Sequence, residues 1–284
     1  MPCNLCPRNC NVERKTQTGF CKAPYEAIVS KTMLHFGEEP IISGKNGSGA
    51  IFFSGCNLLC SFCQNRAISK EIKGEKHSVD SLVATFFDLQ NKGAHNINLV
   101  TPTPYLHVIT PALEIFKKSS TLPVVYNCGG YESVSALRAL DGLVDVYLPD
   151  LKYKSSTLSH SLSCAPNYFE VAIKAIEEMV RQQPKTVITN DICEKGVIIR
   201  HLVLPSCADD SIEIVNTIKQ RFPSALISLM SQYTPEFYAG ENKDLKRKLT
   251  SFEYKKVLSE VERLGLDGFC QSRTSATSEM TPDF

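Results

Sequence analysis

Residues 50–65 read AIFFSGCNLLCSFCQN, and this stretch decides how the rest of the chain is interpreted. Its first part, Ala50–Ser54, is apolar and aromatic, as expected of a buried β-strand. Its second part places Cys56, Cys60 and Cys63 at positions i, i+4 and i+7, directly after the strand. At the chain's cysteine frequency of 12 in 284, such a spacing arises by chance in about one chain in fifty.

Three thiolates in a loop after a strand are suited to an iron-sulfur cluster. Thiolate sulfur is the soft ligand that such clusters use, and three cysteines on a four-iron cluster leave one iron open to another ligand. Gly55 lets the backbone wrap closely around such a group. A zinc ion would need a fourth Cys or His, and none lies within ten residues of the triplet. The structural alternative is a stripe of buried cysteines on one helix face.

From Gly49 onward the chain alternates short β-branched or aromatic runs with longer amphipathic stretches, which predicts a parallel α/β fold. The predicted strands are Ala50–Ser54, Asn96–Val100, Val124–Asn127, Val144–Leu148, Val197–Leu204 and Ala225–Met230. The predicted helices are Val79–Asn91, Tyr105–Lys118, Ser133–Leu140, Tyr168–Arg181, Asp210–Arg221 and Ser251–Leu264. Six such units can form an open doubly wound sheet or a partial barrel, and spacing alone does not choose between them.

Polar residues gather where the predicted strands end. In parallel α/β folds ligands bind at the carboxyl edge of the sheet, so we expect these residues to line one mouth. The candidates for cofactor binding are Thr101, Thr103, Asn127, Asp150, Lys152, Arg200 and Gln232. Asp150 and Lys152 are also the catalytic candidates, and a structural ion pair is the alternative for them. Asn127 and Gln232 equally fit a role in closing turns.

The first 21 residues carry a second set of cysteines, Cys3, Cys6, Cys10 and Cys21. These thiols converge only if the intervening loop folds back, which Gly19 would help it do. A zinc ion and a second iron-sulfur cluster fit the set equally well, and free surface thiols are the alternative.

Three regions are expected along the chain. Residues 1–45 form a Cys-rich metal-binding appendage, residues 46–240 form the barrel, and residues 241–284 form a C-terminal helix and a tail that pack on it. The tail, Gln271–Glu279, is polar and is expected at the surface.

The composition limits the classes of partner that we expect this chain to bind. Lys and Arg number 31 against 30 for Asp and Glu, and this net charge of +1 gives no electrostatic reason to expect nucleic acid or an anionic membrane. No apolar run approaches the roughly 20 residues that span a bilayer, and the first residues carry no export signal. We therefore expect a cytoplasmic protein, whose closely spaced thiols are metal ligands rather than disulfides.

The pattern Cys-x-x-x-Cys-x-aromatic-Cys at positions 56–63 resembles the signature of the radical S-adenosylmethionine superfamily. The resemblance implies a partial (β/α)6 TIM-type barrel and a [4Fe-4S] cluster whose open iron binds S-adenosylmethionine. The cluster would cleave that molecule reductively, and the resulting radical would abstract hydrogen from a substrate. The superfamily commonly has a Gly-Gly-Glu segment after the second strand, where this chain has Thr101-Pro102-Thr103; hydroxyls and backbone carbonyls would serve instead.

Further motifs are similar to the branch of pyruvate formate-lyase activating enzymes, and they cover nearly the whole chain. They are Cys3-x-x-Cys6-Pro7-Arg8-x-Cys10 with Gly19-x-Cys21, and the segments His35–Pro40, Asn96–Pro102, Tyr147–Tyr153 and Arg200–Pro205. This resemblance implies an oxidoreductase that takes hydrogen from a glycine of a partner glycyl-radical enzyme, with a flavodoxin- or ferredoxin-like electron donor. The alternatives are a radical enzyme acting on another small molecule or peptide, and a non-catalytic metal-binding interaction module.

Overall fold

The computed structural model describes residues 3–271. Its strands are β1 (Ala27–His35), β2 (Ser48–Phe53), β3 (Glu75–His77), β4 (Ile97–Val100), β5 (Val124–Cys128), β6 (Val146–Pro149), β7 (Val187–Thr189), β8 (Ile192–Leu202), β9 (Leu226–Met230) and β10 (Gly268–Cys270). Its helices are α1 (Pro40–Ser43), α2 (Arg66–Ser69), α3 (Val79–Asn91), α4 (Leu106–Lys117), α5 (Val134–Arg138), α6 (Ser156–Ser163), α7 (Tyr168–Gln182), α8 (Ala208–Arg221) and α9 (Ser251–Leu264). Short 3₁₀ turns lie at Thr103–Tyr105, Pro235–Phe237 and Lys243–Lys246.

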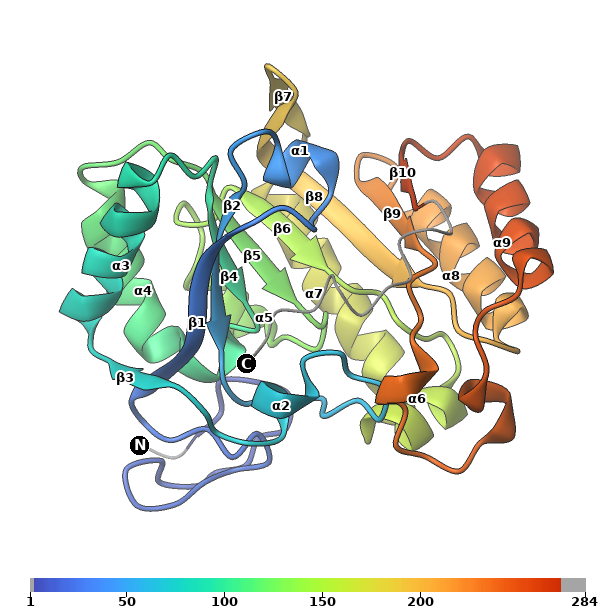
Figure 1. Ribbon diagram of the computed structural model, residues 1–284, viewed down its shortest axis with the longest axis horizontal. Coiled ribbons are helices and arrows are strands. Elements are labelled where there is room, and N and C mark those ends of the chain that lie inside the picture. The colour runs from blue at the N-terminus through green and yellow to red at the C-terminus, as the bar shows by residue number, and fades with distance from the viewer. Residues whose placement is uncertain (1–2, 272–284) are drawn as a thin grey trace.

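One sheet organises the molecule, in the order β10-β9-β8-β6-β5-β4-β2-β1-β3, with β7 paired to β8. Strands β2, β4, β5, β6, β8, β9 and β10 run parallel to their neighbours in this order. The antiparallel strands β1 and β3 end the sheet beyond β2. Figure 1 shows the sheet curving around an inner space, with α3, α4, α7, α8 and α9 on its outer side. The predicted fold class, an α/β partial barrel, is confirmed.

Local signals set the ends of two helices where they were predicted. Ser78 caps α3 by accepting a hydrogen bond from the backbone N–H of Ser81, and Gly93, with φ +84°, follows its end. Thr250 and Glu253 form a capping box at the start of α9, and Gly265 ends it at φ +57°. Reciprocal caps satisfy backbone donors that would otherwise lack partners, which is why these bounds were readable from sequence.

Other elements differ from the prediction. The segment after residue 27 forms one nine-residue strand, β1, antiparallel to β2. Strand β8 starts at Ile192 rather than Val197, because the turn at Asn190 and Asp191, with φ of 50° and 63°, folds β7 back on it. Strand β10 was not predicted; it adds a short parallel partner to β9. Beyond Gln271, the predicted polar tail lies outside the described residues.

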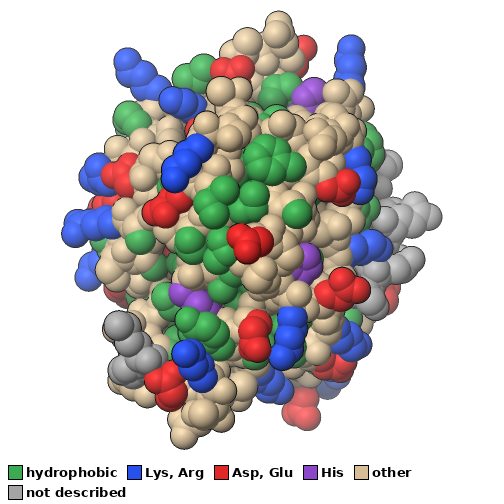
Figure 2. Space-filling view, turned by 90° about the vertical axis from the view of Figure 1, so that its left-hand side faces the viewer, with side chains coloured by type: hydrophobic (Ala, Val, Ile, Leu, Met, Phe, Trp, Pro, Cys, Tyr) green, Lys and Arg blue, Asp and Glu red, His purple; other side chains and the backbone are tan. Residues whose placement is uncertain are grey.

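The outer surface over α3 and α4 is mixed in character. Figure 2 shows this side of the molecule, where hydrophobic, acidic and basic side chains are interspersed and many of the Lys and Arg side chains project at the rim. In the part of the chain that the structure describes, no helix combines the length and apolar character needed to cross a membrane.

Candidate active site

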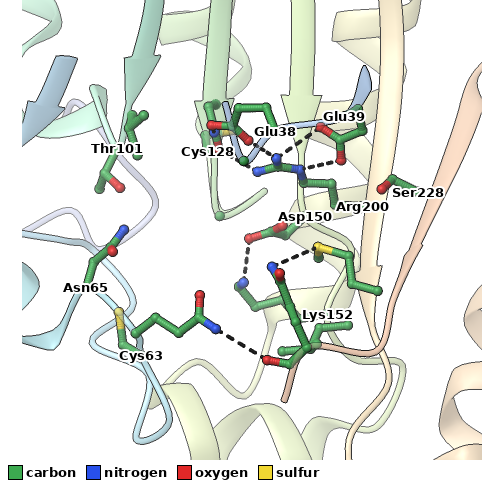
Figure 3. Close-up of a pocket in the computed structure, with 18 of the residues that line it drawn as sticks. Glu38, Glu39, Cys63, Asn65, Thr101, Cys128, Asp150, Lys152, Arg200 and Ser228 are labelled. Carbon is green, nitrogen blue, oxygen red and sulfur yellow. Dashed lines mark hydrogen bonds and ion pairs between the residues drawn. The ribbon is translucent and has the colours of Figure 1, made fainter. Parts of the chain in front are cut away.

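A cavity of about 620 Å³ opens on the inner side of the curved sheet, a size typical of small-molecule sites. It brings together nine of the predicted site residues, which come from segments far apart in the chain (Figure 3). They are Cys56, Cys60, Cys63, Thr101, Asn127, Asp150, Lys152, Arg200 and Gln232. The parallel strands place these residues together because their carboxyl ends share one edge of the sheet.

The cysteine loop is tightly constrained where it leaves β2. Gly55 has φ +86°, and a Cβ there would lie 2.8 Å from the carbonyl oxygen of Cys21. Leu59 also adopts a positive φ, of 55°. The backbone N–H of Leu58 donates to Cys56 Sγ at 3.4 Å, and Ser163 Oγ donates to Cys60 Sγ at 2.9 Å. The Leu58 hydrogen bond lowers the pKa of Cys56, although burial outweighs it.

The three thiols fit a cluster chemically. All three are free cysteines. Burial, and then the neighbouring Cys60 and Cys63, raise the pKa of Cys56 to about 12. The Cys56 sulfur is therefore protonated until metal displaces the proton. No three His, Cys, Asp or Glu side chains between residues 3 and 271 stand ready to chelate a single ion, and a cluster of several irons does not require that they do.

Asp150 and Lys152 form an ion pair beside the cysteine loop. Lys152 Nζ lies 2.5 Å from Asp150 Oδ2, and the two side chains are 18% and 20% exposed. Burial opposes the charge on Lys152, but the attraction of Asp150 outweighs it and raises the pKa of the ammonium group, with smaller contributions from Cys60 and Cys63. A fixed positive charge thus faces the thiols.

Arg200 occupies the other end of the cavity and is held by two carboxylates. Its Nε donates to Glu39 Oε1 at 2.9 Å and one terminal nitrogen donates to Glu39 Oε2 at 3.0 Å. The same terminal nitrogen contacts Glu38, and the other donates to Asn127 Oδ1 at 3.3 Å. Burial alone would raise the pKa of Glu39, but the guanidinium lowers it. Each nitrogen of Arg200 therefore already has a protein partner.

Glu38 and Glu39 are site residues that lie in the His35–Pro40 motif but were not predicted as candidates. Glu38 Oε1 also accepts hydrogen bonds from Asn98 Nδ2 at 2.9 Å and Asn127 Nδ2 at 3.1 Å. The adjacent carboxylates before Pro40 were the available signal. Their partner Arg200 lies 161 residues away in the chain, so the signal did not locate them. Asn65 and Ser228 also line the cavity and were missed.

Gln232 lines the cavity with its amide engaged by neighbours. Gln271 Nε2 donates to Gln232 Oε1 at 3.2 Å, and Gln64 Nε2 donates to the Gln232 carbonyl oxygen at 3.3 Å. These contacts link the loop after β9 to the end of the cysteine loop. Gln232 therefore lines the cavity and connects these two segments.

Thr101 and Thr103 take different directions after β4. Thr101 lines the cavity and has φ +59°, an unusual value for a β-branched residue. Thr103 is absent from the cavity lining, because its Oγ1 donates to the buried carboxyl of Glu132 at 2.9 Å. Tyr126 donates to the same carboxyl at 3.2 Å. The Thr103 hydroxyl is therefore committed to the protein interior.

The N-terminal cysteines lie outside this cavity but close to its loop. The Cys21 carbonyl packs against Gly55, and Cys6 and Cys21 each lie near two of the other three thiols of the set. All four are free thiols that are partly exposed.

The chain is similar in sequence to a known family and to an uncharacterized protein. The family model described as the Radical SAM superfamily matches residues 50–193. An uncharacterized protein of Methanocaldococcus jannaschii is 34% identical over 274 residues, covering 93% of this chain and 75% of that protein.

Several solved structures share the fold at low sequence identity. SuiB of Streptococcus suis, bound to its precursor peptide SuiA, gives a TM-score of 0.55 at 14% identity, over 79% of this chain and 48% of SuiB. Methylornithine synthase gives 0.52 at 16% identity, over 81% and 70% of the two chains. A radical SAM methyltransferase from Sphaerobacter thermophilus gives 0.53 at 13% identity, over 80% and 67%. The chain therefore spans about half the length of SuiB.

The buried carboxyl behind Thr103 predicts a pH-dependent stability. Burial raises the pKa of Glu132 from 4.5 to about 7, so the folded chain keeps a proton that the unfolded chain loses between these values. Stability is therefore lost as pH rises through about 7, by up to about 3 kcal/mol. Glu132→Gln should remove this pH-dependent loss. In urea unfolding of the metal-free chain, the free energy of unfolding of the variant should rise relative to that of the wild type between pH 5 and pH 8. The exposed Glu170→Gln is the control, and parallel pH profiles for wild type and Glu132→Gln would contradict the assignment.

Proposed function

The chain belongs to the radical S-adenosylmethionine superfamily, whose members use a [4Fe-4S] cluster and S-adenosylmethionine, and we propose that Cys56, Cys60 and Cys63 hold that cluster here. The observation that carries the proposal is the convergence of three free thiols from one constrained loop on a cavity lined by strand ends. When bound, the reduced cluster and S-adenosylmethionine supply a 5′-deoxyadenosyl radical that abstracts hydrogen from a substrate.

The residues around the cluster and S-adenosylmethionine have different proposed roles. Lys152 holds a positive charge beside the thiols and orients the Asp150 carboxylate through their ion pair. Thr101 presents its backbone at the cavity wall, and Asn65 adds an amide. Arg200 acts through Glu38 and Glu39 to fix the inner wall. Thr101, Asn127, Asp150, Lys152 and Gln232 remain our proposed contacts to S-adenosylmethionine.

An electron donor of the flavodoxin or ferredoxin type is the partner that this chemistry requires. Radical SAM enzymes receive one electron per cleavage from such proteins. The proposed electron path ends at the Cys56–Cys63 loop. Cytoplasmic location remains our expectation.

Removing the three thiols tests the cluster assignment. The triple variant Cys56/Cys60/Cys63→Ala should fold but lose reductive cleavage, because no other cysteines line the cavity at a spacing that could replace them. After anaerobic reconstitution and reduction, 5′-deoxyadenosine is measured, with Cys207→Ala as control. Formation of 5′-deoxyadenosine by the triple variant would refute the assignment. If the wild type takes up no iron or cleaves nothing, the chain is instead a non-catalytic metal-binding module.

A matched pair of lysine variants tests the role of Lys152. Lys152→Met and Lys117→Met each break an ion pair of similar exposure, 18% and 20% for Lys152–Asp150 against 17% and 19% for Lys117–Asp145. Both should cost stability because each leaves a half-buried carboxylate unpaired. Only Lys152→Met should lower S-adenosylmethionine cleavage per bound iron, by roughly tenfold or more, corresponding to about 1.4 kcal/mol. Equal cleavage by the two variants would remove Lys152 from the cofactor site.

The source of the abstracted hydrogen is the finer part of the proposal. The resemblance at Asp150-Leu151-Lys152 and at Arg200 favours a glycine on a partner glycyl-radical enzyme. The reconstituted chain, S-adenosylmethionine and a glycyl-radical enzyme from the same genome, labelled with α-deuterated glycine, should give a protein radical by electron paramagnetic resonance and deuterium in 5′-deoxyadenosine. Cleavage without either signal would point to a small molecule or another peptide as substrate.

A further inference from the structure

Residues 3–24 fold against the barrel with almost no core of their own. The segment contains no helix and no extended strand, and only Arg14 and Ala23 within it are buried. Three of its non-glycine residues, Asn9, Asn11 and Lys22, adopt positive φ angles. A segment of this length that buries one apolar side chain cannot be held by the hydrophobic effect alone. Small irregular segments of this kind are usually fixed by disulfides or by a metal ion.

Backbone contacts hold Cys10 against Gly19 and Phe20, directly before Cys21. Cys10 Sγ accepts a hydrogen bond from the Phe20 N–H at 3.3 Å. Gly19 makes room for that sulfur, since a Cβ there would lie 2.9 Å from Cys10 Sγ. Cys6 lies near Cys10 and Cys21, and burial raises the pKa of its thiol to about 12. The cysteines are unpaired by disulfides, so the thiols are available as ligands.

We propose that Cys3, Cys6, Cys10 and Cys21 bind one zinc ion as four thiolates, and that this ion fastens residues 3–24 onto the cysteine loop of the active site. Zinc is the simplest metal that could fix residues 3–24 through these cysteines. Four thiolates complete its tetrahedral shell, and no inorganic sulfide is required. The sulfurs do not yet stand at single-ion distance. Binding therefore turns the side chains inward and releases the thiol protons.

Arg8 connects the proposed zinc site to the active-site loop. Its Nε donates to the carbonyl oxygen of Asn57 at 2.8 Å, directly after Cys56. Its terminal nitrogens donate to the carbonyl oxygens of Ser163, at 3.1 Å, and Cys164, at 2.5 Å. Ser163 in turn donates to Cys60 Sγ. Since Arg8 lies between two of the proposed ligands in the chain, fixing those ligands fixes Arg8 on the loop.

The charges around the site are also complementary. Zinc bound by four thiolates carries a net charge of −2, which requires nearby cations when the site is partly buried. The Arg8 guanidinium lies 3.8 Å from the Phe20 ring centroid, within the same segment. Arg14 is buried, donates to the carbonyl oxygens of Ala23, Pro24 and Pro104, and lies near enough to Cys21 to favour its thiolate.

The test separates this site from the active-site cluster by using the full chain with Cys56, Cys60 and Cys63 replaced by Ala. In that background, metal analysis should find about one zinc ion per chain. Adding Cys6→Ser or Cys21→Ser should reduce zinc at least tenfold, whereas adding Cys207→Ser should leave it unchanged. The zinc measurement does not depend on S-adenosylmethionine cleavage. Absence of zinc would therefore leave the proposed function intact, and absence of cleavage would leave the zinc proposal intact.

Two outcomes would overturn the proposal. Absence of zinc together with about four irons and matching sulfide per chain would show a second cluster, and absence of both metals would show free thiols. If the serine variants fail to fold, Co²⁺ substitution of the triple-alanine chain replaces them: the proposal requires the visible absorption of a tetrahedral thiolate site. Arg8→Gln in the otherwise native chain should keep zinc but lose the active-site cluster faster in air, and an unchanged loss rate would disprove the link through Arg8.

Discussion

A buried guanidinium shared between two carboxylates holds the open barrel together from the inside. Arg200 lies on β8, whereas Glu38 and Glu39 follow β1 near the opposite end of the sheet, so their contacts join segments whose strands are not neighbours in the sheet. Removing one partner of such a buried group costs about 3–5 kcal/mol, because a charge is left without compensation. The segment between β1 and α1 is therefore fixed as an inner wall, and α1 packs against β8 and its neighbours through Ile41 and Ile42.

This inner wall forms one end of the cavity and sets the arrangement of the groups along it. The hydrogen bonds of Arg200 are satisfied within this wall by Glu38, Glu39 and Asn127. Figure 3 shows Asp150 and Lys152 between the wall and the cysteine loop, with Cys63 and Asn65 beyond them. Arg200 and its two carboxylates lie at one end of the cavity, the Asp150–Lys152 ion pair lies between, and the thiols line the opposite end.

Local and periodic features were predictable from sequence, and long-range ones were not. The strand before Cys56, the alternation of strands and helices, and the gathering of Asp150 and Lys152 at one edge follow from periods of 2 and 3.6 and from the geometry of parallel sheets. The pairing of Arg200 with Glu38 depends on β1 lying antiparallel beyond β2, which no local pattern specifies. Thr103 turned inward because Glu132, itself buried, needed donors.

The segment after β4 places a β-branched residue in a left-handed backbone conformation. The superfamily commonly has Gly-Gly-Glu there, and glycine adopts positive φ at little cost. Thr101 adopts φ +59° without glycine, at roughly 1–2 kcal/mol for an L-residue. Its N–H is held by the Asn127 carbonyl oxygen at 2.9 Å, and Pro102 follows it. This hydrogen bond holds Thr101 in a strained conformation at the cavity wall, which is where such strain is usually found in proteins.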